Sequence, residues 1–335
     1  MNLETDAGAG DPHTRWAFFA VAVCCAFAIT TAGEAQAQSY PRKPVRIVIA
    51  FTAGGGADTV ARVLARKMSE STGQQFVIDN RPGAGGNIAF EIVAKAEPDG
   101  YTIMNSTTGV VVNPALYRKV PYRMEDFTAV SLIGKAPMIL VVHPSLPVHS
   151  VAELVKLAKA KPGGVRFGAP TGAAGHLTME VFRVMAGVDL QHVPYKGAPQ
   201  ALVDVINGQI EMTALAVPAT MPLVRAKRLR ALAQTGEKRS PVVADIPTLQ
   251  EAGIKDYAVS TWYVIFGPAG MPAEVVSSLN AEILKALKFP DVQEQLINSG
   301  IGEIVGSTPA EATKFVQTEY ARWAKVIKAA HMTAE

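Results

Sequence analysis

Two glycine-rich stretches carry the residues best suited to hold a ligand, and the first covers residues 51–58. It follows residues 45–51, a short apolar run rich in β-branched side chains, which predicts a buried strand. Apolar residues recur at helical spacing after Asp58, which stands where a helix N-cap would stand. A strand that leads through glycines into a helix leaves backbone N–H groups pointing at open space. Such a turn is suited to bind an anion.

The first stretch admits three interpretations. A nucleotide phosphate is disfavoured, because no Lys follows the glycines and they are not in register with G-x-G-x-x-G. A turn without a ligand is a common connection between strand and helix. A carboxylate held by backbone amides is the interpretation that we favour. Asp58 is then expected to cap the helix and orient the loop amides, because its negative charge would repel a bound anion.

A second stretch, residues 171–176, repeats this arrangement after a strand expected over residues 165–168, and its helix is expected to continue to about Ala186. His176 falls in the first helical turn. A lone His is more often packed or solvent-facing than a ligand, and no second His stands at metal spacing. Residues 106–109 (Ser-Thr-Thr-Gly) follow a further expected strand at its carboxyl end, where α/β sheets place ligands. A plain hydroxyl-rich loop is an equal alternative there.

Signs of catalysis are missing from these loops. They contain no paired carboxylates, no Ser–His–Asp set with a nucleophile elbow and no metal cluster. We therefore expect no catalytic residue, no metal and no cofactor. Basic residues are scattered and are not interleaved with aromatics, so nucleic acid is not an expected partner.

Residues 1–37 predict a secretory signal peptide. An apolar run over residues 16–31 is too short for a transmembrane helix, and Ala35-Gln36-Ala37 matches a cleavage pattern. A lipoprotein is disfavoured, because Val23 precedes Cys24 where a small residue is expected. Cleavage after Ala37 would leave a periplasmic chain with 31 basic and 25 acidic residues, a net charge of +6 and no cysteine. Mild positive charge favours the attraction of anionic solutes.

The rest of the chain alternates short apolar runs with helical patterns, which predicts an α/β protein with mostly parallel sheets flanked by helices. About 300 residues suggest two domains. We expect domain 1 to be discontinuous, over residues 38–141 and 259–335, and domain 2 to cover residues 142–258.

Blocks of residues in a characteristic order point to a known family. They are Tyr40-Pro41, Lys43-Pro44, Ala53-Gly54-Gly55 with Asp58, residues 80–86 (Asn-Arg-Pro-Gly-Ala-Gly-Gly), residues 98–102 (Pro-Asp-Gly-Tyr-Thr), Gly187-Val188, residues 192–197, residues 229–233 and Arg322-Trp323-Ala324. With these blocks, which span nearly the whole mature chain, it resembles the tripartite tricarboxylate transporter receptors, extracytoplasmic solute-binding proteins also called Bug receptors.

The resemblance implies a two-domain, periplasmic-binding-protein type II fold with a ligand cleft between the domains. It also implies a small carboxylate ligand (a di- or tricarboxylate, an acidic amino acid or an aromatic acid) and a membrane permease as the partner of a monomeric receptor. Together with the strand-end loops, it gives these candidate ligand-binding residues: Phe51, Ala53, Gly54, Gly55, Gly56, Asp58, Ser106, Thr107, Thr171, Gly172, Ala173, Ala174, His176, Tyr195 and Gly197.

One position departs from the family pattern, since this chain has Thr52 where the family usually has Pro. A hydroxyl there would alter the stiffness of the loop or contact the ligand. Two other functions stay open. A ligand-sensing subunit of a membrane signalling protein needs the same closing cleft as a transport receptor, so the sequence does not separate them. An exported enzyme acting on a carboxylate is the second alternative.

Overall fold

The computed structural model describes residues 40–329 and residue 332, so the predicted signal peptide lies outside the described residues. From Pro41 onward the chain forms one compact unit of contacts. The expected division into two domains therefore stays a prediction. No helix in the described range is long and apolar enough to cross a membrane.

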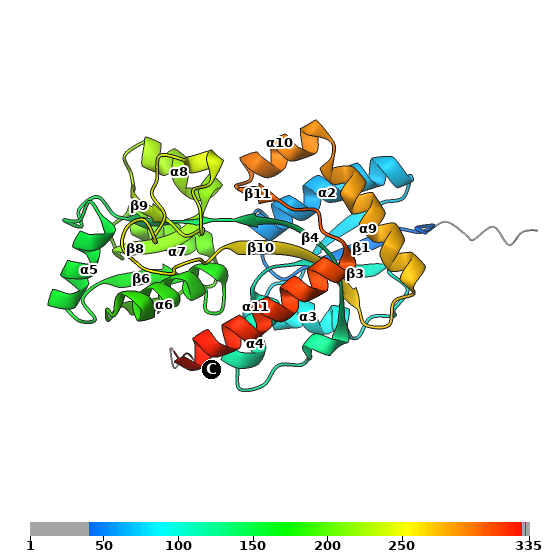
Figure 1. Cartoon of the computed structure of the whole chain (residues 1–335), viewed down its shortest axis with the longest axis horizontal. Coiled ribbons are helices and arrows are strands. Elements are labelled where there is room, and N and C mark those ends of the chain that lie inside the picture. The colour runs from blue at the N-terminus through cyan, green and yellow to red at the C-terminus, as the bar shows by residue number, and fades with distance from the viewer. Residues whose placement is uncertain (1–39, 330–331, 333–335) are drawn as a thin grey trace, which may run out of the picture. The chain divides into compact units, whose positions relative to one another are not determined.

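The chain builds two sheets (Figure 1). The first has the order β11-β4-β10-β3-β1-β2, formed by β1 (Val45–Ile49), β2 (Phe76–Asn80), β3 (Thr102–Ser106), β4 (Phe127–Ala136), β10 (Thr261–Pro268) and β11 (Glu303–Ile304). The second has the order β7-β6-β8-β5-β9, formed by β5 (Met138–Val142), β6 (Arg166–Ala169), β7 (Gln191–Pro194), β8 (Met212–Ala216) and β9 (Arg230–Gln234).

Helices flank both sheets. They are α2 (Gly56–Thr72), α3 (Asn87–Ala94), α4 (Gly109–Leu116), α5 (Val151–Ala160), α6 (Ala174–Ala186), α7 (Ala198–Ile206), α8 (Val217–Arg225), α9 (Ala273–Leu287), α10 (Pro290–Asn298) and α11 (Pro309–Ala329). Short 3-10 turns are η1 (Ala84–Gly86), η2 (Met124–Asp126) and η3 (Pro241–Val243). In the first sheet, α2 lies on one side of the strands and α3 and α4 on the other (Figure 1). The α/β class with two helix-flanked sheets is confirmed.

Strand direction is mixed in each sheet, which corrects the expectation of mostly parallel sheets. Parallel pairing joins β1 to β2 and β3, and β6 to β7 and β8, which are strands connected through helices. The antiparallel pairs involve β4, β5 and β10. These strands belong to segments that pass between the sheets and enter them in the opposite direction.

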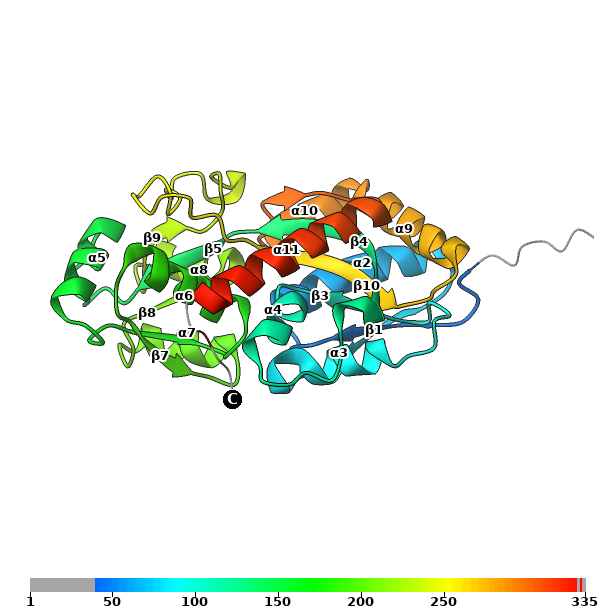
Figure 2. The same ribbon diagram turned by 60° about the horizontal axis from the view of Figure 1, so that its bottom comes forward.

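The connection that leads from the first sheet to the second is short. Only Pro137 separates β4 from β5, so the change of sheet falls a few residues before the expected boundary at 141. The chain returns through residues 235–260 and enters β10, which lies beside β4 (Figures 1 and 2). One hydrophobic cluster includes Val48 of β1, Phe167 of β6 and Trp262 of β10, so the buried core draws on both sheets.

The C-terminal helix is fixed to the first sheet by a shared acceptor. The indole N–H groups of Trp262 and Trp323 both donate to Glu319 Oε2, at 3.0 and 3.1 Å. Both indoles are buried, and α11 packs against β4 and α4 (Figure 2). β10 carries both Trp262 and Tyr263, and Tyr263 lies next to Gly56 at the end of the first glycine loop. The bonds to Glu319 therefore help to hold β10 in place beside that loop.

Candidate functional site

The first glycine loop joins β1 to α2 and is open to solvent. Residues 52–55 are exposed, and Gly54 has a φ of +84°, a conformation that L side chains rarely adopt. Gly55 is the N-cap, with φ −75° and ψ 166°. The first bond of the helix joins Thr59 N–H to Gly55 O at 2.9 Å. The N–H groups of Gly56, Ala57 and Asp58 therefore have no acceptor within the helix.

Asp58 is the third residue of α2, not its N-cap, because the helix begins earlier than the sequence predicted. The side chain is 3% exposed. Its Oδ2 accepts from Gly54 N–H at 2.9 Å, so Asp58 does hold a loop amide. Arg62 adds two bonds to the carboxylate, at 2.9 and 3.0 Å, and Asn80 adds one at 3.0 Å.

These bonds determine the charge state of Asp58. Burial alone would raise the pKa of Asp58, but the bonds from Arg62, Gly54 and Asn80 and the charge of Arg62 lower it below its usual value. The carboxylate is therefore ionised and neutralised by Arg62, which reduces its repulsion of an anion. The hydrogen bond from Gly54 N–H to Asp58 Oδ2 occupies this N–H, so the Gly54 amide is not available to a ligand.

The second glycine loop joins β6 to α6 and has the same backbone plan. Gly172 has a φ of +76°, and the N-cap Ala173 has φ −75° and ψ 162°. His176 is the third helical residue, like Asp58, and its Nδ1 accepts from Gly172 N–H at 3.2 Å. The first helical bond joins Leu177 N–H to Ala173 O at 3.1 Å. Here too, three N–H groups at the start of the helix, on residues 174–176, have no acceptor within it.

His176 is a packed neutral residue. It is 6% exposed, and its ring lies 4.1 Å from that of His192 and 6.3 Å from that of Phe167. Burial, with His192 and Arg183 nearby, lowers the pKa of His176 to about 3. Because Nδ1 accepts a bond from the loop, the ring proton resides on Nε2. His176 is thus the counterpart of Asp58 as a tether of its loop.

Tyr195 and Gly197 lie beside the second loop, but the Tyr195 hydroxyl is engaged elsewhere. Tyr195 N–H donates to Ala169 O at 3.2 Å, whereas its hydroxyl donates to Asp204 Oδ2 in α7 at 2.6 Å. Burial and the bond to Asp204 raise the pKa of Tyr195 to about 12. Gly197 is the N-cap of α7.

The remaining candidates gather near the first loop. Ser106 and Thr107 are buried where β3 ends, and β3 pairs with β1, the strand that leads into the loop. Asn105 of β3 donates to Ala57 O at 2.7 Å, which ties this strand end to the first turn of α2. Phe51 O accepts from Asn80 Nδ2 at 3.0 Å.

The second loop touches an element that flanks the first sheet. A Cβ placed on Gly172 would lie 3.4 Å from Tyr117 Oη and 3.5 Å from Asn113 Oδ1 of α4. A side chain at position 172 would therefore be in van der Waals contact with the segment that follows β3, so the second loop lies close to α4. The neighbouring candidates Thr171, Ala173 and Ala174 are partly exposed beside it.

Sequence reasoning missed Tyr263 of β10. A Cβ placed on Gly56 would overlap the Tyr263 hydroxyl, so the phenol lies directly against the first residue of α2. The sequence shows Tyr263 only as one aromatic residue in an apolar strand. More than 200 residues separate it from Gly56.

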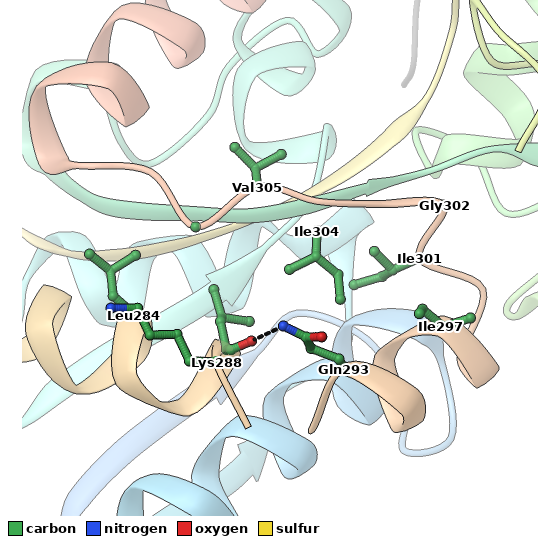
Figure 3. Close-up of a pocket in the computed structure, with 10 residues that line it drawn as sticks. Leu284, Lys288, Gln293, Ile297, Ile301, Gly302, Ile304 and Val305 are labelled. Atoms are coloured by element: carbon green, nitrogen blue, oxygen red, sulfur yellow. Dashed lines mark hydrogen bonds between the residues drawn. The ribbon is translucent and has the colours of Figure 1, made fainter. Parts of the chain in front are cut away.

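A separate hollow lies between α9, α10 and β11 (Figure 3). Its lining is mostly aliphatic, and none of the predicted site residues belongs to it. Gln293, one of its few polar residues, donates to Leu287 O at 3.0 Å. This lining suits apolar groups better than a small dianion. Among residues 40–329, no group of three or more His, Cys, Asp or Glu could hold a metal ion.

The chain is similar to known proteins over most of its length. A Pseudomonas sp. (strain P51) protein, the UPF0065 protein in the tcbD-tcbE intergenic region, is 39% identical over 90% of this chain and 91% of its own. A solved R. palustris structure with adipate has a TM-score of 0.82 at 40% identity and covers 88% of this chain and 99% of its own. MatC from Rhodopseudomonas palustris, solved with bound malate, has a TM-score of 0.79 at 30% identity and covers 86% and 100%.

Residues 60–332 match the family model described as the tripartite tricarboxylate transporter family receptor. This match covers most of the chain and agrees with the resemblance drawn from the sequence blocks. The chain belongs to the tripartite tricarboxylate transporter receptor family.

Proposed function

We propose that this protein is an exported solute receptor that captures a small dicarboxylate with its two glycine loops and delivers it to a membrane permease. The main observation in support of this proposal is that the two loops have the same backbone arrangement. Each has a positive-φ glycine, an extended N-cap and three N–H groups without an acceptor in the helix. Family membership supports the receptor role, and relatives with adipate and malate support the ligand class.

The electrostatics favour one carboxylate on each loop. A helix N-terminus is equivalent to roughly half a positive charge, and backbone N–H groups donate stronger bonds to an ionised acceptor. Arg62 of α2, a cation beside the first loop, is already paired with Asp58. Neither loop offers a full unpaired charge of its own, so we propose that the ligand spans both. The closeness of Gly172 to α4 supports this, because α4 follows β3 of the first sheet.

The proposal includes export to the periplasm. Cleavage after Ala37 would make Gln38 the first residue of the mature protein. Mass spectrometry of the periplasmic protein tests this, and a chain that retains Cys24 with an attached lipid would contradict it. We propose no catalytic activity, since the family is one of receptors.

A thermal-shift screen of the purified mature protein tests the ligand class. The panel is adipate, malate and citrate, with acetate and adipamide as controls for a single carboxylate and for no charge. A ligand at 100 times its dissociation constant stabilises the folded state by about 2.7 kcal/mol. We expect a dicarboxylate to raise the melting temperature and both controls to leave it unchanged. A response to none of the acids would contradict the proposal.

Two further measurements separate the alternatives. Recovery of the bound acid unchanged after long incubation, checked by NMR, supports a receptor, whereas conversion to a product would indicate an enzyme. Uptake of the labelled acid by cells with and without the receptor gene distinguishes transport from sensing. Unchanged uptake in the deletion strain would favour the sensing subunit.

A further inference from the structure

We propose that Tyr263 is an additional ligand-binding residue, whose phenol O–H donates to a carboxylate oxygen at the N-terminus of α2. This inference rests on the proposed function and deepens it. It gives the first loop a side-chain donor beside its main-chain donors.

The position of the phenol supports this role. Tyr263 lies in β10, which pairs with β3 on one side and β4 on the other. Its hydroxyl occupies the space that a Cβ on Gly56 would need. Gly56 is the first residue of α2, and its N–H is one of the three without an acceptor in the helix. A carboxylate bound at this helix start would therefore lie beside the phenol.

Tyr263 is a buried residue whose hydroxyl has no hydrogen-bond partner among the described residues. Tyr263 is 3% exposed, and within the described part of the chain its Oη makes no hydrogen bond. Two other buried tyrosines differ in this respect: Tyr122 donates to Val110 O and Tyr257 to Thr178 O, both at 2.9 Å. The O–H of a buried tyrosine residue usually finds a hydrogen-bond partner. An unpaired donor next to an anion site indicates that the missing acceptor is the ligand.

The hydroxyl is also placed where a ligand can reach it. The side-chain oxygens of Asn105 and Asn113 are unpaired and sealed from solvent, and Tyr263 Oη is not among such sealed atoms. The Asp58 carboxylate is not a competing acceptor, since Gly54, Arg62 and Asn80 already supply its bonds.

The chemistry of the phenol selects an anionic acceptor. Burial raises the pKa of Tyr263 to about 12, so the group stays protonated at neutral pH. A carboxylate with one oxygen on the Gly56 or Ala57 N–H has its second oxygen free for the phenol. Such charge-assisted bonds are stronger than bonds between neutral groups. An amide at the same end of the ligand would accept a weaker bond.

The test uses Tyr263→Phe, which removes only the hydroxyl, and Tyr122→Phe as a matched control. Calorimetry with adipate as the probe measures affinity, and thermal melts without ligand measure stability. We expect Tyr263→Phe to weaken adipate binding about 10- to 100-fold, from the strength of a hydrogen bond to a charged group. Its melting temperature without ligand should equal or exceed that of the parent, because no protein bond is lost. Tyr122→Phe should melt lower and bind as the parent does.

The inference is wrong if Tyr263→Phe binds adipate within twofold of the parent. If this variant also melts as low as Tyr122→Phe, the hydroxyl has a structural role instead. The parent is measured first. Failure of the parent to bind any dicarboxylate would contradict the proposed function and this inference together, whereas an unaffected Tyr263→Phe in a binding-competent parent contradicts this inference alone.

Discussion

Replacement of Asp58 by Ala removes the acceptor that holds the first glycine loop. Four hydrogen bonds end on this buried carboxylate, from Gly54 N–H, from two nitrogens of Arg62 and from Asn80. Removing one partner of a fully buried ion pair typically costs about 3–5 kcal/mol. The Arg62 side chain is 53% exposed, so water replaces part of its lost interaction. We therefore expect Asp58→Ala to lower the free energy of unfolding by about 2 kcal/mol, more than the ~1 kcal/mol typical of an N-cap.

Asp58→Asn separates the charge from the shape of the side chain. An Asn oxygen can still accept from Gly54 N–H, but the ion pair with Arg62 is lost, so we expect a decrease of about 1 kcal/mol at pH 7. The lowered pKa of Asp58 fixes the sign of the pH dependence. Its contribution is complete above the unfolded pKa of about 4 and is lost as pH falls through the folded pKa. The difference between parent and Asp58→Asn should therefore shrink at pH 3.

Urea unfolding at pH 7 and pH 3 measures these differences. Glu91→Ala is the control, because Glu91 pairs with Lys95 on an exposed helix surface and should change stability by less than about 0.5 kcal/mol. Two results would refute the reasoning. One is an Asp58→Ala variant within about 0.5 kcal/mol of the parent, and the other is a gap between parent and Asp58→Asn that widens as the pH falls.

The two loops yield further predictions. Gly54→Ala should lower stability by about 1–2 kcal/mol because of the positive φ. Gly55→Ala should be neutral or stabilising by up to about 1 kcal/mol, since its φ is −75° and its Cβ would lie 3.5 Å from Thr52 O. If urea unfolding shows equal effects for Gly54→Ala and Gly55→Ala, these two predictions are wrong. The lowered pKa of His176 means that the unfolded chain binds a proton that the folded chain does not, so the parent should lose stability as pH falls below about 6.5. His176→Phe should reduce this dependence of stability on pH. It should also weaken ligand binding, because the Gly172 amide loses its acceptor. If pH-dependent melts show the same dependence in the variant, His176 is not a buried neutral ring.

Helices with strong local signals were predictable from the sequence. The helix expected to end near Ala186 ends there, because Gly187 takes the left-handed conformation that terminates it. Ser150 at the start of α5 is a local signal of the same kind, since its side chain accepts from Glu153 N–H. At the start of α2, by contrast, glycine made the helix boundary hard to predict. Gly55 offers no side-chain signal for an N-cap, so the sequence placed the cap at Asp58, three residues too late.

Features that depend on distant segments were not predictable in the same way. Strand direction in each sheet depends on where β4, β5 and β10 enter, which local periodicity does not report. Tyr263 meets Gly56 only because β10 inserts between β3 and β4, and no pattern near Tyr263 indicates this. The engagement of the Tyr195 hydroxyl by Asp204 likewise depends on how α7 packs.

We propose that both loops hold one ligand together, and matched substitutions that crowd the two N-caps test this. Gly55 and Ala173 share an extended backbone, so Val fits the conformation at either position, whereas Val at Gly172 would strain a positive φ. Calorimetry with the best dicarboxylate of the screen would compare Gly55→Val and Ala173→Val with the parent, after urea unfolding has shown both variants to be folded. We predict that each substitution alone weakens binding by at least about tenfold, from the loss of one or more charge-assisted bonds. If either variant binds as tightly as the parent, a single loop holds the ligand and the shared site is wrong.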